Sequence, residues 1–193
     1  MKTEKKDFFN VRSMVFTAIF AALICVAAPY AIPMPGLVPI SLGTFAIYLT
    51  GAMLGGKRGT VAVCVYILLG AVGLPVFTGF MGGFAKLLGP TGGYIVGYIP
   101  LVLLTGIFSD MQPKKHWTMP VGMVIGTAVM YAFGTAWFMI MNGSPLGTAL
   151  MNCVVPFLIG DTIKIVLATI IAVPLRSRLN AIMQGSSKSR LDK

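Results

Sequence analysis

The sequence predicts an all-α integral membrane protein with six transmembrane helices in one bundle and both termini in the cytoplasm. Of its 193 residues, 56% are hydrophobic and only 10% are charged, and the mean hydropathy is +0.88. This composition is typical of a polytopic membrane protein, and the length allows about six spans of about 20 residues with short loops. The third observation is the uneven placement of the basic residues, which sets the orientation.

Long apolar runs separated by glycine and proline predict the helices in order. The first helix follows a basic N-terminal tail at 1–12 and is followed by three prolines and a glycine between Ile32 and Ile40. This segment is predicted to form an irregular cap, because non-helical backbone at membrane depth must be buried in protein or line a cavity. A tight turn, GGKRG, then separates a short second helix from the third. The predicted helices are Ser13–Ala31, Ser41–Gly55, Thr60–Val76, Pro90–Phe108, Thr118–Met141 and Cys153–Val173.

The remaining segments are predicted to be connections and tails. A glycine- and aromatic-rich connection, Phe77–Gly89, precedes the fourth helix, and a polar turn, Ser109–Trp117, follows it. A small polar loop, Asn142–Asn152, leads into the sixth helix. The chain is therefore divided into tails at 1–12 and 176–193, both basic and cytoplasmic, and one membrane domain at 13–175.

The basic residues orient the bundle. Thirteen of the fifteen Lys and Arg residues fall in the two tails, the GGKRG turn and the turn before the fifth helix, all on one predicted face. The positive-inside rule places that face in the cytoplasm. The formal net charge of +10 is thus explained by the cytoplasmic face and anionic lipid, and no nucleic-acid partner is expected.

Two opposite charges interrupt the sixth helix. Its sequence, CVVPFLIGDTIKIVLATIIAV, contains Asp161 and Lys164, and each costs about 2.5–3.5 kcal/mol near the centre of a membrane helix. Residues three apart lie on the same helix face, so the two side chains can pair with each other or bind one polar ligand together. The first alternative is a neutralised pair that holds helices together. The second is a pocket for a ligand that carries both an acid group and N–H donors.

Enzymatic and metal sites are not supported. The single histidine, His116, lies in a predicted cytoplasmic turn, and the three cysteines have no metal-ligand spacing. A near match to a phosphate-binding loop at 51–58 fails, because Arg58 stands where Ser or Thr should bind magnesium. We therefore expect no enzyme, no metal site, no cofactor and no ATP site in this chain. A stand-alone ion-coupled carrier for a small carboxylate, using Asp161 and Lys164, remains the alternative to a binding protein.

Several motifs, in order, resemble the BioY family. They are GLPVF at 73–77, GG at 82–83, GPTGGY at 89–94 and GDTIK at 160–164, and the resemblance extends from the first helix to GDTIK. BioY proteins are the biotin-specific substrate-binding (S) components of energy-coupling factor (ECF) transporters. Gly43 departs from the family pattern, in which a glutamine is common at this position.

The resemblance implies that residues 13–175 form a six-helix substrate-binding domain that captures biotin from outside a prokaryotic plasma membrane. It also implies a transmembrane coupling protein and two ATP-binding subunits as partners, with Ala18 and Ala22 of the first helix docking the coupling protein. Biotin has a carboxylate and a ureido ring with two N–H groups, which suits Asp161 and Lys164, although which charge meets which end stays open. The predicted ligand-binding residues are Asp161, Lys164, Thr91, Tyr94, Thr44, Phe80 and Gly93.

Overall fold

The structure is a computed structural model that describes residues 11–32, 38–111 and 117–188, with side chains described up to Leu179. Four predicted features lie wholly or partly outside the described residues. These are the basic N-terminal tail at 1–10, the centre of the proline-rich cap at 33–37, the polar turn at 112–116 with His116, and the chain end at 189–193.

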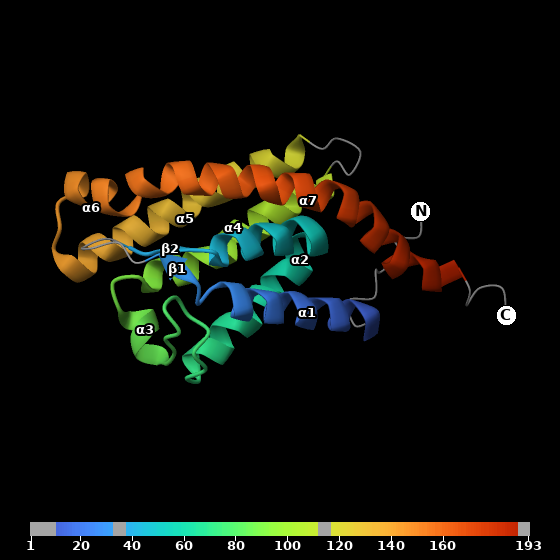
Figure 1. The fold of residues 1–193 in the computed structure, drawn as a ribbon, viewed down its shortest axis with the longest axis horizontal. Coiled ribbons are helices and arrows are strands. Elements are labelled where there is room, and N and C mark those ends of the chain that lie inside the picture. The colour runs from blue at the N-terminus through green and yellow to red at the C-terminus, as the bar shows by residue number, and fades with distance from the viewer. Residues whose placement is uncertain (1–10, 33–37, 112–116, 189–193) are drawn as a thin grey trace, which may run out of the picture.

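The helices form one elongated bundle (Figure 1). The described elements, in chain order, are α1 (Val11–Ala27), β1 (Ala31–Ile32), β2 (Ile40–Ser41), α2 (Gly43–Ala71), α3 (Phe84–Leu88), α4 (Gly92–Met111), α5 (Thr118–Asn142), α6 (Leu146–Cys153) and α7 (Val155–Lys188). The start of α1 and the end of α7 lie at the same end of the bundle, on the right of Figure 1. The opposite end carries α3, α6 and the short antiparallel pair β1–β2.

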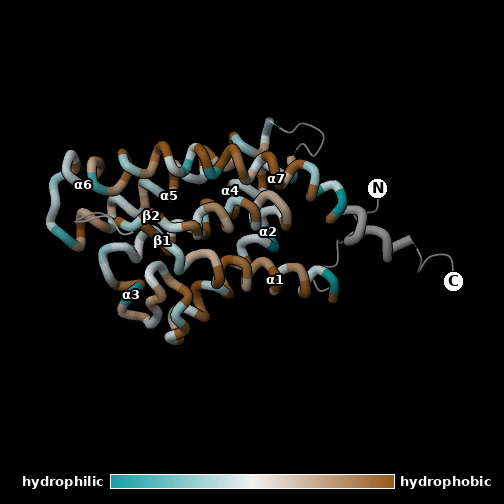
Figure 2. Tube along the Cα trace, in the orientation of Figure 1, coloured by the Kyte–Doolittle hydropathy of each residue, from teal (hydrophilic) through white to brown (hydrophobic). Residues whose placement is uncertain are grey.

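Several helices are long and apolar enough to cross a membrane. Among the described residues, four segments meet this description: α2, α4, α5 and the continuous run of α6 and α7 to Leu179, while α1 is a shorter apolar helix. Hydrophobic residues run along these helices, and hydrophilic residues gather toward the two ends of the bundle (Figure 2). The chain is therefore a helical, multi-pass membrane protein, as its composition predicted.

A sharp kink divides α2 into two halves. Gly55 has φ of 78° and ψ of 176°, a non-helical conformation that is essentially restricted to glycine. The chain reverses direction here, so the first half (43–54) and the second half (56–71) run in opposite directions (Figure 1). The predicted GGKRG turn lies at this kink. Gly106 of α4 packs directly against the backbone of Gly55 and Gly56, where a side chain at 106 would collide with it.

The helix α4 lies between α2 and α5 and makes close backbone approaches to both. A methyl group added at Gly97 would lie 3.1 Å from Met130 of α5, and one at Gly126 of α5 would lie 2.9 Å from Leu101 of α4. Small residues at such crossings let membrane helices pack by close van der Waals contact. This packing holds the first half of α4 against α5.

Several predicted boundaries differ from the structure, among them the end of the third helix, which was predicted at Val76 and lies at Ala71. The first helix ends at Ala27, four residues early, because the chain turns to pair Ala31 with Ser41 in the β1–β2 ladder. The predicted loop at 142–152 contains α6, which begins after Pro145, and the connection at 77–89 contains the short helix α3. The last helix does not end at Val173, as predicted, but continues to Lys188.

Candidate ligand pocket

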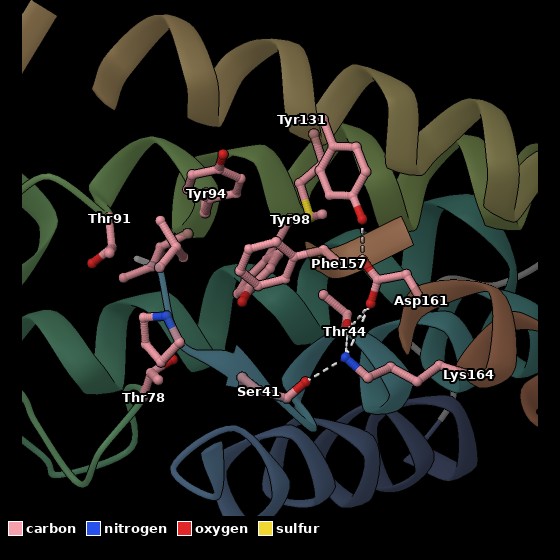
Figure 3. Close-up of a pocket in the computed structure, with 14 residues that line it drawn as sticks. Ser41, Thr44, Thr78, Thr91, Tyr94, Tyr98, Tyr131, Phe157, Asp161 and Lys164 are labelled. Atoms are coloured by element: carbon pink, nitrogen blue, oxygen red, sulfur yellow. Dashed lines mark hydrogen bonds and ion pairs between the residues drawn. The ribbon is translucent and has the colours of Figure 1, made fainter. Parts of the chain in front are cut away.

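A pocket opens among the first turns of α2, α4 and α7 and the middle of α5, near the end of the bundle that carries β1–β2. Its empty volume is about 530 Å³, part of which is open to the surroundings. The residues that line it come from five parts of the chain: Val38, Pro39, Ser41, Thr44, Thr78, Thr91, Tyr94, Ile95, Tyr98, Met130, Tyr131, Phe157, Asp161 and Lys164. Figure 3 shows the charged pair at one end of the pocket and two threonines at the other.

The charged pair of α7 forms a direct ion pair. Lys164 Nζ lies 3.0 Å from Asp161 Oδ1, and the two residues are only 9% and 3% exposed. The same ammonium group donates hydrogen bonds to the Ser41 carbonyl oxygen at 2.7 Å and to Thr44 Oγ1 at 3.0 Å. The i, i+3 spacing on α7 thus brings both charges onto the face that meets the start of α2.

Two hydroxyl groups complete the surroundings of Asp161. Tyr131 of α5 donates a hydrogen bond of 2.6 Å to Oδ2, and Thr44 donates one of 3.2 Å to Oδ1. A carboxylate has about four lone-pair positions, so Asp161 keeps about one acceptor position after three hydrogen bonds. An ammonium group has three N–H donors, and Lys164 uses all of them. This end of the pocket therefore offers a hydrogen-bond acceptor to a ligand more readily than a donor.

Local structure explains why the Ser41 carbonyl is available to Lys164. The Ser41 hydroxyl donates to the Ala28 carbonyl oxygen and accepts from the Gly43 N–H, both at 2.8 Å. These bonds fix the turn from β2 into α2 and direct the Ser41 carbonyl toward α7. Gly43 faces Ala28, where a methyl group would lie only 3.0 Å from the Ala28 side chain. Any larger residue here needs this turn to shift.

The other end of the pocket carries Thr78 and Thr91, with the rings of Tyr98 and Phe157 lying between the two ends (Figure 3). Among the described residues, the hydroxyl groups of Thr78, Thr91 and Tyr98 have no hydrogen-bond partner. Tyr94 contributes its ring, because its own hydroxyl donates to the Cys153 carbonyl oxygen at 3.2 Å. The pocket thus has an acceptor at the charged end, apolar rings in its middle and free hydroxyl groups at the far end.

Five of the seven predicted ligand-binding residues line this pocket: Thr44, Thr91, Tyr94, Asp161 and Lys164. Phe80 does not; it is 58% exposed and packs edge-on against Tyr30, with ring centroids 5.3 Å apart. Gly93 is also absent from the lining, and its Cα faces Trp137 of α5.

Sequence reasoning missed four polar groups of the pocket, those of Ser41, Thr78, Tyr98 and Tyr131. Tyr98 follows Tyr94 by one helical turn on α4, a spacing that could have identified it. Tyr131 and Ser41 gave no comparable signal, since one is an isolated tyrosine in an apolar helix and the other contributes a backbone carbonyl.

Two other predictions concern features away from the pocket. Ala18 and Ala22 are both exposed on α1. Within the part of the chain that the structure describes, no group of three His, Cys, Asp or Glu residues could hold a metal ion.

Comparisons with known proteins agree with this architecture. The model of the BioY family matches residues 1–181. The biotin transporter BioY of Thermotoga maritima is 39% identical over 166 residues, which cover 86% of this chain and 96% of that protein. BioY2 of Lactococcus lactis is 36% identical and covers 84% of this chain and 89% of its own. A 2.1 Å crystal structure of the S-component for biotin from an ECF-type ABC transporter matches with a TM-score of 0.80 and 30% identity, covering 92% of this chain and 95% of that chain.

Proposed function

Because the chain belongs to the BioY family, we propose that it is the biotin-binding S component of an ECF transporter. The observation that carries this proposal is the pocket that Asp161 and Lys164 line together. The buried ion pair is not sealed inside the bundle, so it can neutralise itself and still present an acceptor to a ligand. The two alternatives that the sequence left open are therefore compatible.

The hydrogen-bonding inventory favours one orientation of biotin. The ureido ring carries two N–H donors and fits the free acceptor position of Asp161 and the hydroxyl of Tyr98. A carboxylate at this end would meet the charge of Asp161 while Lys164 has no N–H left to offer. The carboxylate of biotin then lies toward Thr78 and Thr91, whose hydroxyl groups can donate to it. The rings of Tyr98 and Phe157 contact the apolar middle of the ligand.

Family membership supports the wider assembly that we propose. The chain contributes six transmembrane helices, counting both halves of α2, and both termini lie in the cytoplasm of a prokaryotic cell. It works with a transmembrane coupling protein and two ATP-binding subunits in the cell membrane. The exposed Ala18 and Ala22 offer α1 a smooth surface for close approach of the coupling protein.

The stand-alone carrier is the weaker alternative. The relatives that match most of the chain are named as biotin transporters of one family, and the matching crystal structure is a component of an ABC transporter. An ion-coupled carrier would need a group that binds and releases its coupling ion. Asp161 is instead fixed by a lysine and two hydroxyl groups.

The proposal is tested by titrating the detergent-purified chain with biotin in a calorimeter. Wild type should bind one biotin, and Asp161→Asn should bind it at least about tenfold more weakly, because Lys164 loses its buried counter-charge. Thr162→Ala is the matched control, since Thr162 is exposed on the next position of α7 and should stay within about twofold of wild type. Absence of heat with biotin in folded wild-type protein would contradict the function.

A further inference from the structure

The helix α7 is attached to α2 by two polar clusters, an outer one at the start of α2 and an inner one at its kink. The outer cluster joins Lys164 and Asp161 to Ser41 and Thr44. The inner cluster joins Arg176 of α7, through Asp110 of α4, to the backbone N–H of Gly56 at the kink. The two helix segments run side by side in the same direction (Figure 1).

The spacing of the two clusters matches on both helices. Lys164 and Arg176 are twelve residues apart on α7, and Thr44 and Gly56 are twelve residues apart on α2. At 1.5 Å per residue, the separation on α7 is about 18 Å, and the helical stretch from Thr44 to Leu54 covers about 15 Å of α2 before the chain turns at Gly55. Both clusters can therefore form at once only when α7 sits at one position along the first half of α2.

The inner cluster depends on one carboxylate. Arg176 Nη2 donates to Asp110 Oδ1 at 2.6 Å, and Asp110 Oδ2 accepts the Gly56 N–H at 3.2 Å. Arg176 is 8% exposed, and its Nε and Nη1 atoms are buried with no partner among the described residues. Asp110 is thus its one ion-pair partner in the described chain. Loss of Asp110 leaves a buried guanidinium without a counter-charge.

Between the two clusters, α7 contacts the bundle through apolar side chains. Its buried residues there are apolar and two of them are small: Ile165, Ala168 and Ala172. Apolar contact is non-directional, so it resists separation of the helices more than sliding of one along the other. The run from α6 through α7 is also the least buried of the four candidate membrane spans. We therefore expect the two polar clusters to determine the position of α7 along α2.

We propose that Arg176 and Asp110 are positioning residues for the biotin pocket. Their ion pair fixes α7 along the first half of α2 and so keeps Asp161 and Lys164 in contact with Ser41 and Thr44. Neither residue lines the pocket, so their effect on the ligand passes through the position of α7. This inference rests on the proposed function, because biotin affinity is the quantity that tests it.

The test is biotin titration of the full chain with substitutions at the inner cluster. Arg176→Ala and Asp110→Ala should each weaken biotin binding about tenfold, within the range by which interacting residues couple. Arg178→Ala removes an equal charge from an exposed position of α7, two residues further on, and should stay within about twofold of wild type. Arg176→Lys, which keeps the charge and one donor to Asp110, should recover most of the lost affinity.

A double-mutant cycle separates positioning from a general loss of stability. Thr44→Ala weakens the outer cluster directly, so Arg176→Ala should cost clearly less affinity in that background than in wild type. The proposal is wrong if the losses of affinity from Thr44→Ala and Arg176→Ala are additive. It is also wrong if Arg176→Ala and Asp110→Ala bind biotin as tightly as Arg178→Ala does. If Arg176→Ala fails to fold, the same cycle is run with Arg176→Gln and Asp110→Asn, which remove the charge but keep most of the side-chain volume. Failure of wild type to bind biotin would instead remove the proposed function.

Discussion

The two ion pairs of the described chain differ in their surroundings. Asp161 and Lys164 lie three residues apart on one helix, are both buried, and make four further hydrogen bonds with neighbouring helices and turns. Asp110 and Arg176 are 66 residues apart, and the carboxylate is 57% exposed. A locally encoded pair with full hydrogen bonding makes a recognition surface, whereas a long-range pair with few partners connects helices.

Removing the lysine of the pocket pair should give the largest effect. Lys164→Ala leaves the Asp161 carboxylate buried without its counter-charge, which typically costs about 3–5 kcal/mol. It also deprives Ser41 and Thr44 of a donor. We expect biotin affinity to fall by at least about a hundredfold, with a lower unfolding temperature measured by differential scanning fluorimetry.

The comparison with the inner pair sharpens this prediction. In the same titration, Arg176→Ala should weaken biotin binding by about tenfold, compared with about a hundredfold for Lys164→Ala. Equal losses would show that the two pairs contribute alike, and the distinction between recognition and connection would then be wrong.

Substitution of Gly55, at the kink that Asp110 contacts, should have the next largest effect on biotin affinity. Gly55→Ala places a residue with a side chain at φ of 78°, which costs about 1–3 kcal/mol, and directs its methyl group into the Asp110 carboxylate. We expect a lower unfolding temperature and a several-fold loss of biotin affinity through the inner pair. Gly143→Ala is the control, because Gly143 has φ of 61° with open space around it and ends α5 far from Asp110. A similar loss of affinity in both variants would show that the kink has no specific effect on the pocket.

Local features of the fold could be predicted from the sequence. Apolar runs and glycines located most helices and the α2 kink, because both depend on neighbouring residues in the chain. The segment 142–152 was predicted to be a loop since Asn142, Gly143, Ser144 and Pro145 dominate its start, yet its second part forms α6.

The candidate site divides in the same way. Asp161 and Lys164 were identifiable because charges within a membrane helix are costly and their spacing is local. Tyr131, the Ser41 carbonyl and the Asp110–Arg176 pair were not, since each becomes a partner only when distant segments pack together. Gly93 belongs to a family-like motif and Phe80 lies between two of them, but Phe80 packs outside the pocket and Gly93 serves helix packing.

The smallest expected effect is at the far end of the pocket, where no ion pair is present. Thr78→Val and Thr91→Val each remove one hydroxyl group that can donate to the carboxylate of biotin, at a partly exposed position. One such hydrogen bond contributes about 0.5–1.5 kcal/mol, so each variant should bind biotin about two- to tenfold more weakly.

Biotin methyl ester, whose carboxylate is masked, should bind wild type and both variants with similar affinity. The opposite orientation gives a different result: Asp161→Asn would then weaken binding of the ester no more than the threonine variants do. In that case the ureido ring does not contact Asp161, and the ligand lies the other way round. The charged end of the pocket would then recognise the acid, and Lys164 would have to give up one of its three present acceptors to do so.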